Sequence, residues 1–407
     1  MTKKSDAPAI RFKGFSDAWE QRKVGEVSES YSGGTPSVGV KEYYGGQIPF
    51  IRSAEINSEI TELFLTEEGL KNSSARLVAV GDILYALYGA TSGEVGRARL
   101  KGAINQAILA IKPHTDYDSE YLAQWLRKSK HSIIETYLQG GQGNLSGTIV
   151  KELSVDFPSL KEQKAIGDFF RQLDNLITLH QRKFEKLTNV KKSMLEKMFP
   201  QNGSSYPIIR FKGFTDPWEQ RKLGEMGQTY TGLSGKTKDD FGHGQARFVT
   251  YMNVFSNPIS NPEMTEPIEI DPKQNEVEVG DVFFTTSSET PEEVGMSSIL
   301  LEKRGKTYLN SFCFGFRPSE KIDSYYLAYM LRSESTRAKI ILLAQGISRY
   351  NISKNKVMEI AVSLPSLDEQ KMIGQYFSQL DNLITLHQRE LEKLQNIKKS
   401  MLEKMFV

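Results

Sequence analysis

The segment LKEQKAIGDFFRQLDNLITLHQRKFEKLTNVKKSMLEKM occupies residues 160–198, and it returns at residues 367–405 as LDEQKMIGQYFSQLDNLITLHQRELEKLQNIKKSMLEKM. Neither copy contains proline, and apolar residues recur along both in alternating steps of four and three. This spacing predicts a long amphipathic helix with the a/d seam of a coiled coil. At about 1.5 Å per residue, each helix would be roughly 58 Å long.

A helix of this length cannot bury its apolar stripe alone, so the two copies are expected to pack together as an antiparallel pair. Pro158 and Ser159 precede the first copy and Pro200 follows it, as expected at helix ends. His180 and His387 share one heptad position. We interpret them as seam residues, because no further Cys, His or acidic residue stands at metal-ligand spacing.

The repetition extends beyond these helices. RFKGFSDAWEQRKVGE at residues 11–26 returns as RFKGFTDPWEQRKLGE at 210–225, with 13 of 16 positions identical, and residues 157–199 match 364–406 at 33 of 43 positions. The blocks between, residues 27–156 and 226–363, differ in length and align only at scattered points such as Val80-Gly81-Asp82 with Val279-Gly280-Asp281. We therefore expect a pseudo-twofold repeat whose two variable blocks share a fold and differ in surface.

The variable blocks have the pattern of mixed α/β domains. Short strands are predicted at 47–52, 82–88 and 106–112 and at 247–252, 281–285 and 311–317. A short helical stretch flanked by residues 121–128 and 136–138 and a helix around 325–331 are also expected. The fold class is thus predicted as α+β: two mixed α/β domains separated by a pair of long antiparallel coiled-coil helices, with a pseudo-twofold internal repeat. The expected boundaries are 1–156 for the first domain, 157–199 for the first helix, 200–363 for the second domain and 364–407 for the second helix.

Bulk composition is that of an ordinary globular protein, with 39% hydrophobic and 25% charged residues. No apolar run approaches the roughly 18–20 residues that cross a bilayer, and the first residues lack the apolar core of a signal peptide, so we expect a cytoplasmic protein without a membrane partner. The single Cys313 fits a reducing compartment. Residues 27–156 and 226–363 are slightly acidic, so any DNA contact must rest on local clusters of basic side chains.

Motifs for chemistry are missing from the sequence. An amino-methyltransferase needs an Asn/Asp-Pro-Pro-aromatic loop, and the chain has no Pro-Pro pair. Gly140-Gly141-Gln142-Gly143 fails to complete G-x-G-x-x-G because Ser146 takes the last glycine position, and Gly235-Lys236-Thr237 lacks the earlier glycine of a phosphate-binding loop. The five histidines are scattered singly, which gives no support to a nucleophile–base pair. We predict a non-catalytic chain with no metal and no cofactor of its own.

What remains is a set of polar, glycine-flanked loops in both blocks. They supply Arg, Gln, Asn, Ser, Thr and Tyr, which are side chains that contact base edges and phosphates. A single loop of this kind is a weak signal, since most polar loops are only loops.

The arrangement as a whole resembles the specificity subunits of type I restriction-modification systems. The first block carries Ser32-Gly33-Gly34-Thr35-Pro36-Ser37, Ile48-Pro49-Phe50-Ile51, Gly89-Ala90-Thr91-Ser92-Gly93 and Asn105-Gln106, as is typical of the target-recognition domains of that family. Pro158-Ser159-Leu160 with Glu162-Gln163, and their copies Pro365-Ser366-Leu367 with Glu369-Gln370, match the helix starts. The second block departs from the pattern, with Thr231-Gly232-Leu233-Ser234 in place of the Gly-Gly-Thr-Pro turn and Ser311 in place of Gln106.

The resemblance implies that each variable domain reads one half of a bipartite double-stranded DNA target, and that the helices set the gap. It implies two modification subunits that bind S-adenosylmethionine and methylate adenine in each half-site. It also implies two restriction subunits, motor-nucleases that use ATP and Mg²⁺. Two identical partners need two equivalent docking surfaces, whereas two unlike half-sites need two unlike readers.

Arg52 is the leading candidate for a base or phosphate contact. The full set of candidate DNA-binding residues is Thr35, Arg52, Ser53, Glu55, Tyr88, Thr91, Ser92, Gln106, Gln142, Asn144, Lys236, Tyr251, Asn253, Ser288, Arg349 and Asn351.

Two other classes of protein stay open at this stage. A coiled-coil scaffold with protein- or glycan-binding heads fits the helical repeats equally well, but not the recognition-domain motifs. A stand-alone nuclease or methyltransferase is disfavoured by the missing motifs.

Overall fold

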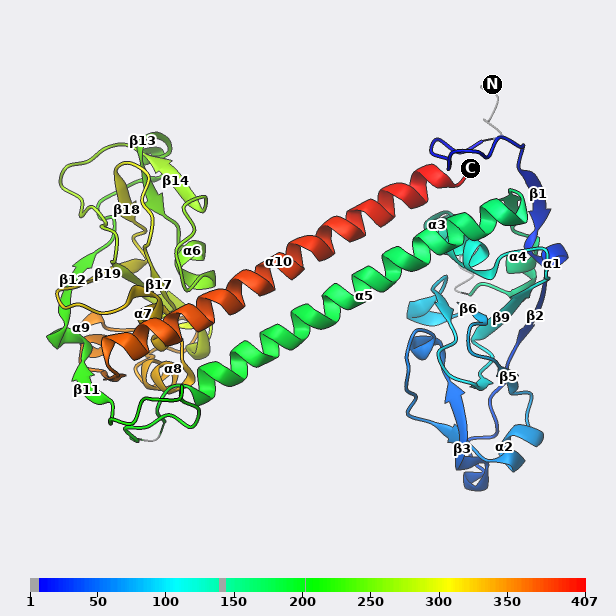
Figure 1. Cartoon of the computed structure of the whole chain (residues 1–407), viewed down its shortest axis with the longest axis horizontal. Coiled ribbons are helices and arrows are strands. Elements are labelled where there is room, and N and C mark those ends of the chain that lie inside the picture. The colour runs from blue at the N-terminus through cyan, green and yellow to red at the C-terminus, as the bar shows by residue number, and fades with distance from the viewer. Residues whose placement is uncertain (1–6, 139–143, 202) are drawn as a thin grey trace. The chain divides into compact units, whose positions relative to one another are not determined.

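The computed structural model describes residues 7–138, 144–201 and 203–407. The chain divides into two compact units: unit 1 contains Met1–Gln181 and Arg389–Val407, and unit 2 contains Arg182–Gln388. Each unit therefore combines one variable block with the beginning of one long helix and the end of the other (Figure 1).

Unit 1 is built on two four-stranded sheets, ordered β2-β9-β6-β7 and β4-β3-β8-β5, in which β3 and β8 are parallel and the other pairs antiparallel. The first sheet contains β2 (Ser28–Ser32), β9 (Ile108–Pro113), β6 (Ile83–Ala86) and β7 (Val95–Arg97), and the second contains β4 (Phe64–Leu65), β3 (Tyr44–Ile51), β8 (Gly102–Ile104) and β5 (Arg76–Val78). A further pair joins β1 (Glu20–Lys23) to β10 (Ser154–Phe157), and the helices are α1 (Val24–Val27), α2 (Glu67–Lys71), α3 (Ser119–Leu138) and α4 (Gly147–Glu152).

The central strand β6 is buried on both faces, which explains its unbroken apolar sequence. Ile83 and Tyr85 pack in one cluster with Tyr121 of α3, whereas Leu84 and Ala86 pack in another with residues of the second sheet. The first sheet is thus sandwiched between α3 and the second sheet.

Unit 2 repeats this layering and its strand order, but its second sheet has three strands where that of unit 1 has four. Its main sheet contains β12 (Gly227–Thr231), β19 (Cys313–Pro318), β15 (Val282–Thr285) and β17 (Ser297–Ile299), and its second sheet contains β14 (Thr265–Ile268), β13 (Phe241–Val249) and β18 (Thr307–Leu309). Two strand pairs, β11 (Glu219–Lys222) with β21 (Ala361–Leu364) and β16 (Ser287–Ser288) with β20 (Tyr350–Asn351), and four helices, α6 (Tyr251–Ser256), α7 (Ser324–Met330), α8 (Glu334–Ile341) and α9 (Lys354–Met358), complete it. The place of α3 is taken by α7 and α8, and Ser333 begins α8 by accepting from the Thr336 N–H.

The long helices are α5 (Leu160–Lys197) and α10 (Leu367–Met405). Their starts are buried in the unit that precedes them in the chain, and their ends are buried in the opposite unit. In unit 1 the ring of Phe406 stacks on Phe170 with centroids 5.8 Å apart, and in unit 2 Phe199 stacks on Phe377 at the same separation. Burial of each such side chain contributes about 1.5–3 kcal/mol.

The repeated RFKGF segment is held to the start of each helix by one arginine. Arg11 donates to both carboxylate oxygens of Glu162, at 2.7 and 2.8 Å, and to the Asp17 carbonyl. Arg210 makes the same three bonds to Glu369 and Asp216. The two glutamates are only 1% exposed, so the bidentate pair is what makes their burial tolerable.

The next residue of each helix binds the variable block that precedes it in the chain. Gln163 accepts from the Asp118 N–H and donates to the Pro158 carbonyl, and Gln370 does the same with Asp323 and Pro365. Four residues further on, the helix passes so close to this corner that glycine is required, because a Cβ on Gly167 would lie 2.6 Å from Asp118 Oδ1. The repeats are therefore nearly identical in large part because the same buried contacts hold each helix start to its unit.

A lysine near the end of each helix pairs with an aspartate near the start of the other. In unit 1 Lys398 donates to Asp174 at 2.5 Å, and Asp174 also accepts from Gln124 and Arg127 of α3. In unit 2 Lys191 pairs with Asp381, which also accepts from the Tyr329 hydroxyl. Within each unit the beginning of one helix is thus joined to the end of the other. No helix of the described residues is long and apolar enough to span a membrane.

Two predicted elements need correction. The strand expected at 247–252 ends at Val249, because the Thr250 side chain accepts from the Asn253 N–H and begins α6. The short helical stretch expected between residues 121–128 and 136–138 is part of one long helix, α3, which includes both flanks.

Candidate nucleic-acid interface

The leading candidate, Arg52, lies where β3 ends and the 3-10 helix η2 (Ser53–Glu55) begins. Its guanidinium binds Glu55 at 2.8 and 3.2 Å and Glu62 at 2.7 Å. Glu55 also accepts from the Arg52 and Glu62 backbone N–H groups and from the Thr61 hydroxyl, so this carboxylate is an anchor of the loop. Ser53, between them, is partly buried.

The electrostatics of this cluster follow from the pairing. Partial burial opposes ionisation of Glu55, but hydrogen bonds from Arg52 and from backbone N–H groups outweigh it and lower the pKa of Glu55 to about 2. The same bonds raise the pKa of Arg52. Both groups are therefore charged at neutral pH, and the Arg52 side chain, 38% exposed, is neutralised by its own domain.

Thr35 and Gln106 are exposed and lie together, with the Thr35 hydroxyl donating to the Gln106 side-chain carbonyl. The preceding turn presses against β8, since a Cβ on Gly33 would lie 1.8 Å from the Ile104 carbonyl oxygen. The Gly-Gly-Thr-Pro motif is thus explained by a close approach that brings Thr35 to Gln106.

The remaining candidates of the first block differ in accessibility. Tyr88 and Thr91 are partly buried, and the exposed Asn144 forms a bridge with Tyr88. Ser92 is 8% exposed and its hydroxyl donates to the Leu87 carbonyl, so it supports the loop and does not face solvent as expected. Gln142 lies outside the described residues.

In the second block three candidates line one pocket. Tyr251 of α6, Ser288 of β16 and Arg349 before β20 border a cavity of about 400 Å³. Asn351 is exposed in β20 next to it. Three loops that are far apart in the sequence therefore converge on one surface.

Asn253 is a correction to the predicted set. It is fully buried, its side-chain amide donates to the Asn261 and Met264 carbonyls, and its side-chain carbonyl accepts from the Asn261 N–H. In this position Asn253 holds a loop together and does not face a ligand. Asn253 comes three residues after Thr250, just as Glu55 comes three residues after Arg52. Each of the two side chains holds together the loop that follows a strand.

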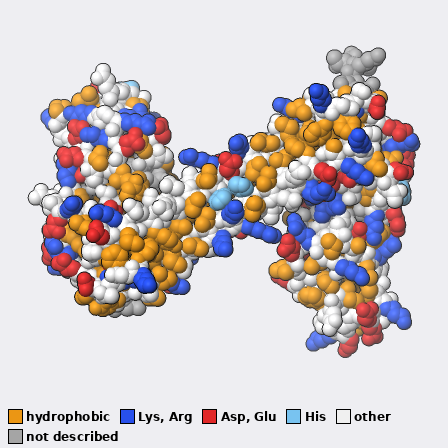
Figure 2. All heavy atoms as spheres, in the orientation of Figure 1, with side chains coloured by type: hydrophobic (Ala, Val, Ile, Leu, Met, Phe, Trp, Pro, Cys, Tyr) orange, Lys and Arg blue, Asp and Glu red, His pale blue; other side chains and the backbone are white. Residues whose placement is uncertain are grey.

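Lys236 lies outside the pocket and is engaged by acids. Its ammonium is 2.9 Å from Asp271 Oδ2 and 3.7 Å from Asp240 Oδ1, and hydrogen bonding to Asp271 raises the pKa of Lys236. On the face shown in Figure 2, Lys/Arg and Asp/Glu side chains are interspersed on both units. That basic side chains gather locally for contact with phosphate therefore stays a prediction.

The long helices carry a duplicated groove. On α5 it is lined by Arg182, Glu185, Lys186, Asn189, Val190, Ser193 and Met194, and on α10 by Arg389, Glu392, Lys393, Asn396, Ile397, Ser400 and Met401. The two grooves lie at corresponding positions and differ only in valine against isoleucine. The polar residues that line the two grooves are exposed or partly exposed, and they are identical in the two helices.

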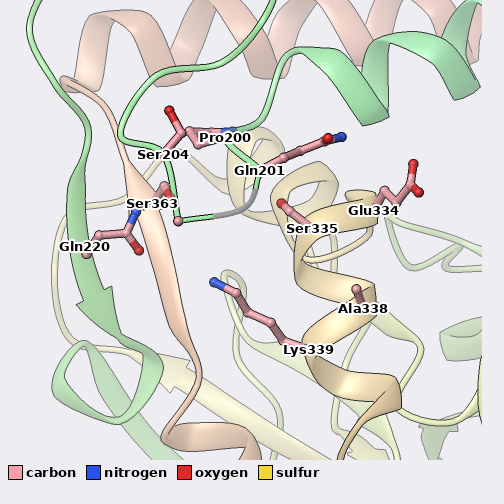
Figure 3. Close-up of a pocket in the computed structure, with 10 residues that line it drawn as sticks. Pro200, Gln201, Ser204, Gln220, Glu334, Ser335, Ala338, Lys339 and Ser363 are labelled. Carbon is pink, nitrogen blue, oxygen red and sulfur yellow. Dashed lines mark hydrogen bonds between the residues drawn. The ribbon is translucent and has the colours of Figure 1, made fainter.

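A further pocket, about 310 Å³, lies in unit 2 beneath the segment that follows α5 (Figure 3). Lys339 of α8 points into it, and Gln220 and Ser363 on its wall are hydrogen-bonded to each other. It contains none of the predicted residues. Among the described residues, no three His, Cys, Asp or Glu side chains gather in a way that could hold a metal ion.

Comparison with known families accounts for both repeats at once. The family model described as the type I restriction modification DNA specificity domain matches residues 16–189 and again residues 215–396. The chain belongs to the type I restriction-modification specificity family. The resemblance noted from the sequence is thereby confirmed.

Curated members of the specificity family match this chain over all or part of their length. The MjaVIII specificity subunit of Methanocaldococcus jannaschii is 23% identical over 94% of this chain and 91% of its own. The EcoR124I/EcoR124II specificity subunit of Escherichia coli is 24% identical over 39% of this chain. Among solved structures, the specificity subunit from M. genitalium has a TM-score of 0.60 at 16% identity and covers 98% of this chain and 99% of its own, which supports the α+β fold with two repeats.

Sequence reasoning missed several residues that the specificity fold places at these surfaces. No local sequence pattern marks Glu62, because its pairing with Arg52 depends on the fold of the segment between these two residues, which are ten positions apart. Glu289 and Glu293 line the same pocket as Tyr251, Ser288 and Arg349, but neither glutamate was among the predicted candidates. Phe312 stands 52% exposed, with the Arg349 guanidinium 5.5 Å from its ring centroid.

Proposed function

We propose that this chain is the DNA sequence-specificity subunit of a type I restriction-modification enzyme, and that each variable block reads one half of a bipartite, gapped target in double-stranded DNA. The observation that carries the proposal is the contrast between the repeated segments (the frame, residues 11–26, 157–199, 210–225 and 364–406) and the two variable blocks. The frame repeats its buried contacts residue by residue, as in Arg11–Glu162 and Arg210–Glu369, while the loops of the two blocks differ. Such a chain offers two equivalent attachments and two unlike readers.

The proposed domains are residues 1–156 and 200–363 for target recognition and 157–199 and 364–407 for the spacer helices. The helices form an antiparallel coiled-coil pair that sets the gap between half-sites. Supporting this, the start of each helix is joined to the end of the other by a lysine–aspartate pair and an aromatic stack in each unit. Parallel helices could not place those residues together in both units.

The duplicated grooves on α5 and α10 are the proposed docking surfaces for two modification subunits. Their shared residues, such as Lys186 with Lys393 and Asn189 with Asn396, are alike without being required for burial. A pair of identical partners explains why exposed residues are repeated. Two restriction subunits complete the proposed assembly.

This chain is assigned no reaction of its own. S-adenosylmethionine would be bound by the modification subunits, and ATP and Mg²⁺ by the restriction subunits. The adenine to be methylated would leave the duplex for a partner's pocket, so this chain supplies sequence choice and register. Because its target is cellular DNA, the proposed location is the cytoplasm.

Contacts to DNA are proposed for the candidates that are exposed or partly exposed. These are Thr35, Arg52, Ser53, Tyr88, Thr91, Gln106, Asn144, Lys236, Tyr251, Arg349 and Asn351. Ser288 lines the pocket but is only 8% exposed, so like Ser92 it is left out of this set. For Arg52 we propose that a DNA phosphate or base replaces the exposed Glu62 as a partner of the guanidinium. Glu55 stays bound and keeps the guanidinium oriented.

The test is to map methylated adenines in DNA from cells that carry this chain with its modification subunit. We expect a motif with two specified halves separated by a fixed gap. Exchanging residues 27–156 for another reader should replace one half only. Methylation without sequence preference, or a change in both halves, would refute the proposal.

A further inference from the structure

The pocket of about 400 Å³ in unit 2 has an aromatic floor, a serine edge and a charged rim. The floor is Tyr251 stacked on Phe255, with centroids 6.0 Å apart and ring planes 18° apart. The Tyr251 hydroxyl donates to the Ser287 carbonyl at 2.7 Å, which fixes the floor to the edge. The pocket is therefore a preformed surface within one unit.

One buried group in the pocket lacks a partner. Ser287 lines the pocket and is 4% exposed, and its hydroxyl oxygen makes no hydrogen bond among the described residues. A buried polar group left unpaired costs about 1–3 kcal/mol. A ligand that hydrogen-bonds to Ser287 would recover this cost.

The rim carries two carboxylates and one guanidinium. Glu293 accepts from the Ser288 hydroxyl at 3.1 Å, which orients its carboxylate, and Glu289 stands exposed beside it. Arg349 is exposed, with its guanidinium lying over the Phe312 ring. Carboxylates at a DNA surface are repelled by phosphates, so they are favourable only where they accept from a base. In the major groove only adenine N6 and cytosine N4 offer such donors.

Resting on the function proposed above, we infer that this pocket is a specificity determinant of the second recognition domain, in which Glu293, with Glu289, accepts from the amino group of an adenine or cytosine. Arg349 binds the neighbouring phosphate, and Ser287 pairs with the same base edge. All nine lining residues belong to the variable block, as a specificity determinant requires. Tyr251 and Met252 follow the end of a strand in the second block. At the equivalent place in the first block, after Phe50-Ile51, the residues are Ser53 and Ala54, so the two readers differ at this point.

The experiment uses the full chain with its modification subunit and a DNA library randomised across both half-sites, with methylated adenines read by sequencing. The variants are Glu293→Met and Glu289→Met, which remove the acceptor and keep the length of the side chain. Because both side chains are exposed, little change in thermal stability is expected. The matched control is Glu302→Met, an exposed glutamate of the same domain outside the pocket.

For Glu293→Met we expect the preference for adenine or cytosine at one position of one half-site to fall by about tenfold or more, with a smaller loss for Glu289→Met. The other half-site and the control should be unchanged. Unaltered half-sites in both variants would overturn the inference, as would changes in both halves. A wild-type complex without any sequence preference would instead refute the proposed function, so the two failures are distinguishable.

Discussion

Arg11 shows at the scale of a residue why the repeated frame tolerates so little change. Replacing it by methionine would leave the Glu162 carboxylate, 1% exposed, without either of its guanidinium bonds. We expect Arg11→Met to destabilise unit 1 by about 3–5 kcal/mol, because an unpaired charge is then buried. Amide hydrogen exchange of unit 1 peptides measures this loss, and Arg210→Met should move the same loss to unit 2.

The control for this pair is Arg22→Met. Arg22 binds Glu20 at the surface, where the two side chains are 45% and 66% exposed, so its removal should cost under about 1 kcal/mol. Equal exchange protection in Arg11→Met and wild-type protein would show that the buried pair is not a stabilising device.

Glu62 provides a second residue-scale prediction, because it holds Arg52 from the exposed side. Glu62→Gln should free the guanidinium and tighten DNA binding by up to about fivefold, which is what one exposed ion pair is worth. Arg52→Met should weaken binding and lower the salt slope by about one. Titration of target duplex at several salt concentrations measures both effects, and Glu68→Gln on α2, also exposed, is the control.

A result for Glu62→Gln opposite to the tighter binding expected would contradict this account. Weaker binding by Glu62→Gln would mean that Glu62 positions Arg52 for DNA and does not compete with it.

At the scale of elements, periodicity predicted the two helices almost to the residue: 160–198 against Leu160–Lys197, and 367–405 against Leu367–Met405. Strands were located but their ends were less certain, because a capping side chain such as Thr250 can end a strand that apolar pattern alone would extend. The partners of Glu162 and Gln163 could not be predicted, since pairings across 151 and 45 residues leave no local pattern. The candidate loops were found by composition, whereas their convergence on one pocket depends on the sheet order.

The helices also carry the element-scale prediction. Inserting four residues after Gln181 in α5, with a matching insertion after Gln388 in α10, lengthens each helix by about 6 Å. We expect the gap of the DNA target to widen by about one to two base pairs while both half-sites stay the same. Methylation mapping of the altered complex measures this. An altered half-site would show that the helices do more than set spacing.

At the scale of the whole molecule, the same backbone hydrogen bond joins the end of a long helix to the residue before the RFKGF segment in each unit. In unit 2 the Ile209 N–H donates to the Lys197 carbonyl at 2.9 Å, and in unit 1 the Ile10 N–H donates to the Lys404 carbonyl at 2.9 Å. Nine residues, 200–208, connect Phe199 to Ile209. Joining Val407 to Met1 would connect Phe406 to Ile10 with ten, namely Val407 and residues 1–9.

A permuted chain that begins at Gly203 and ends at Asn202, with Val407 joined to Met1, should therefore fold with every contact within each unit retained. We expect its thermal stability to stay close to that of the original chain and its methylated motif to be identical, because no buried pair is cut. A control permutation opened between Asp174 and Asn175 in α5 should fail, since it cuts the helix beside the aspartate that binds Lys398, Gln124 and Arg127. If the first permutation lost one half-site, the covalent link through residues 200–208 would itself have to hold a recognition domain in place, and the symmetry of the two units would not explain the architecture.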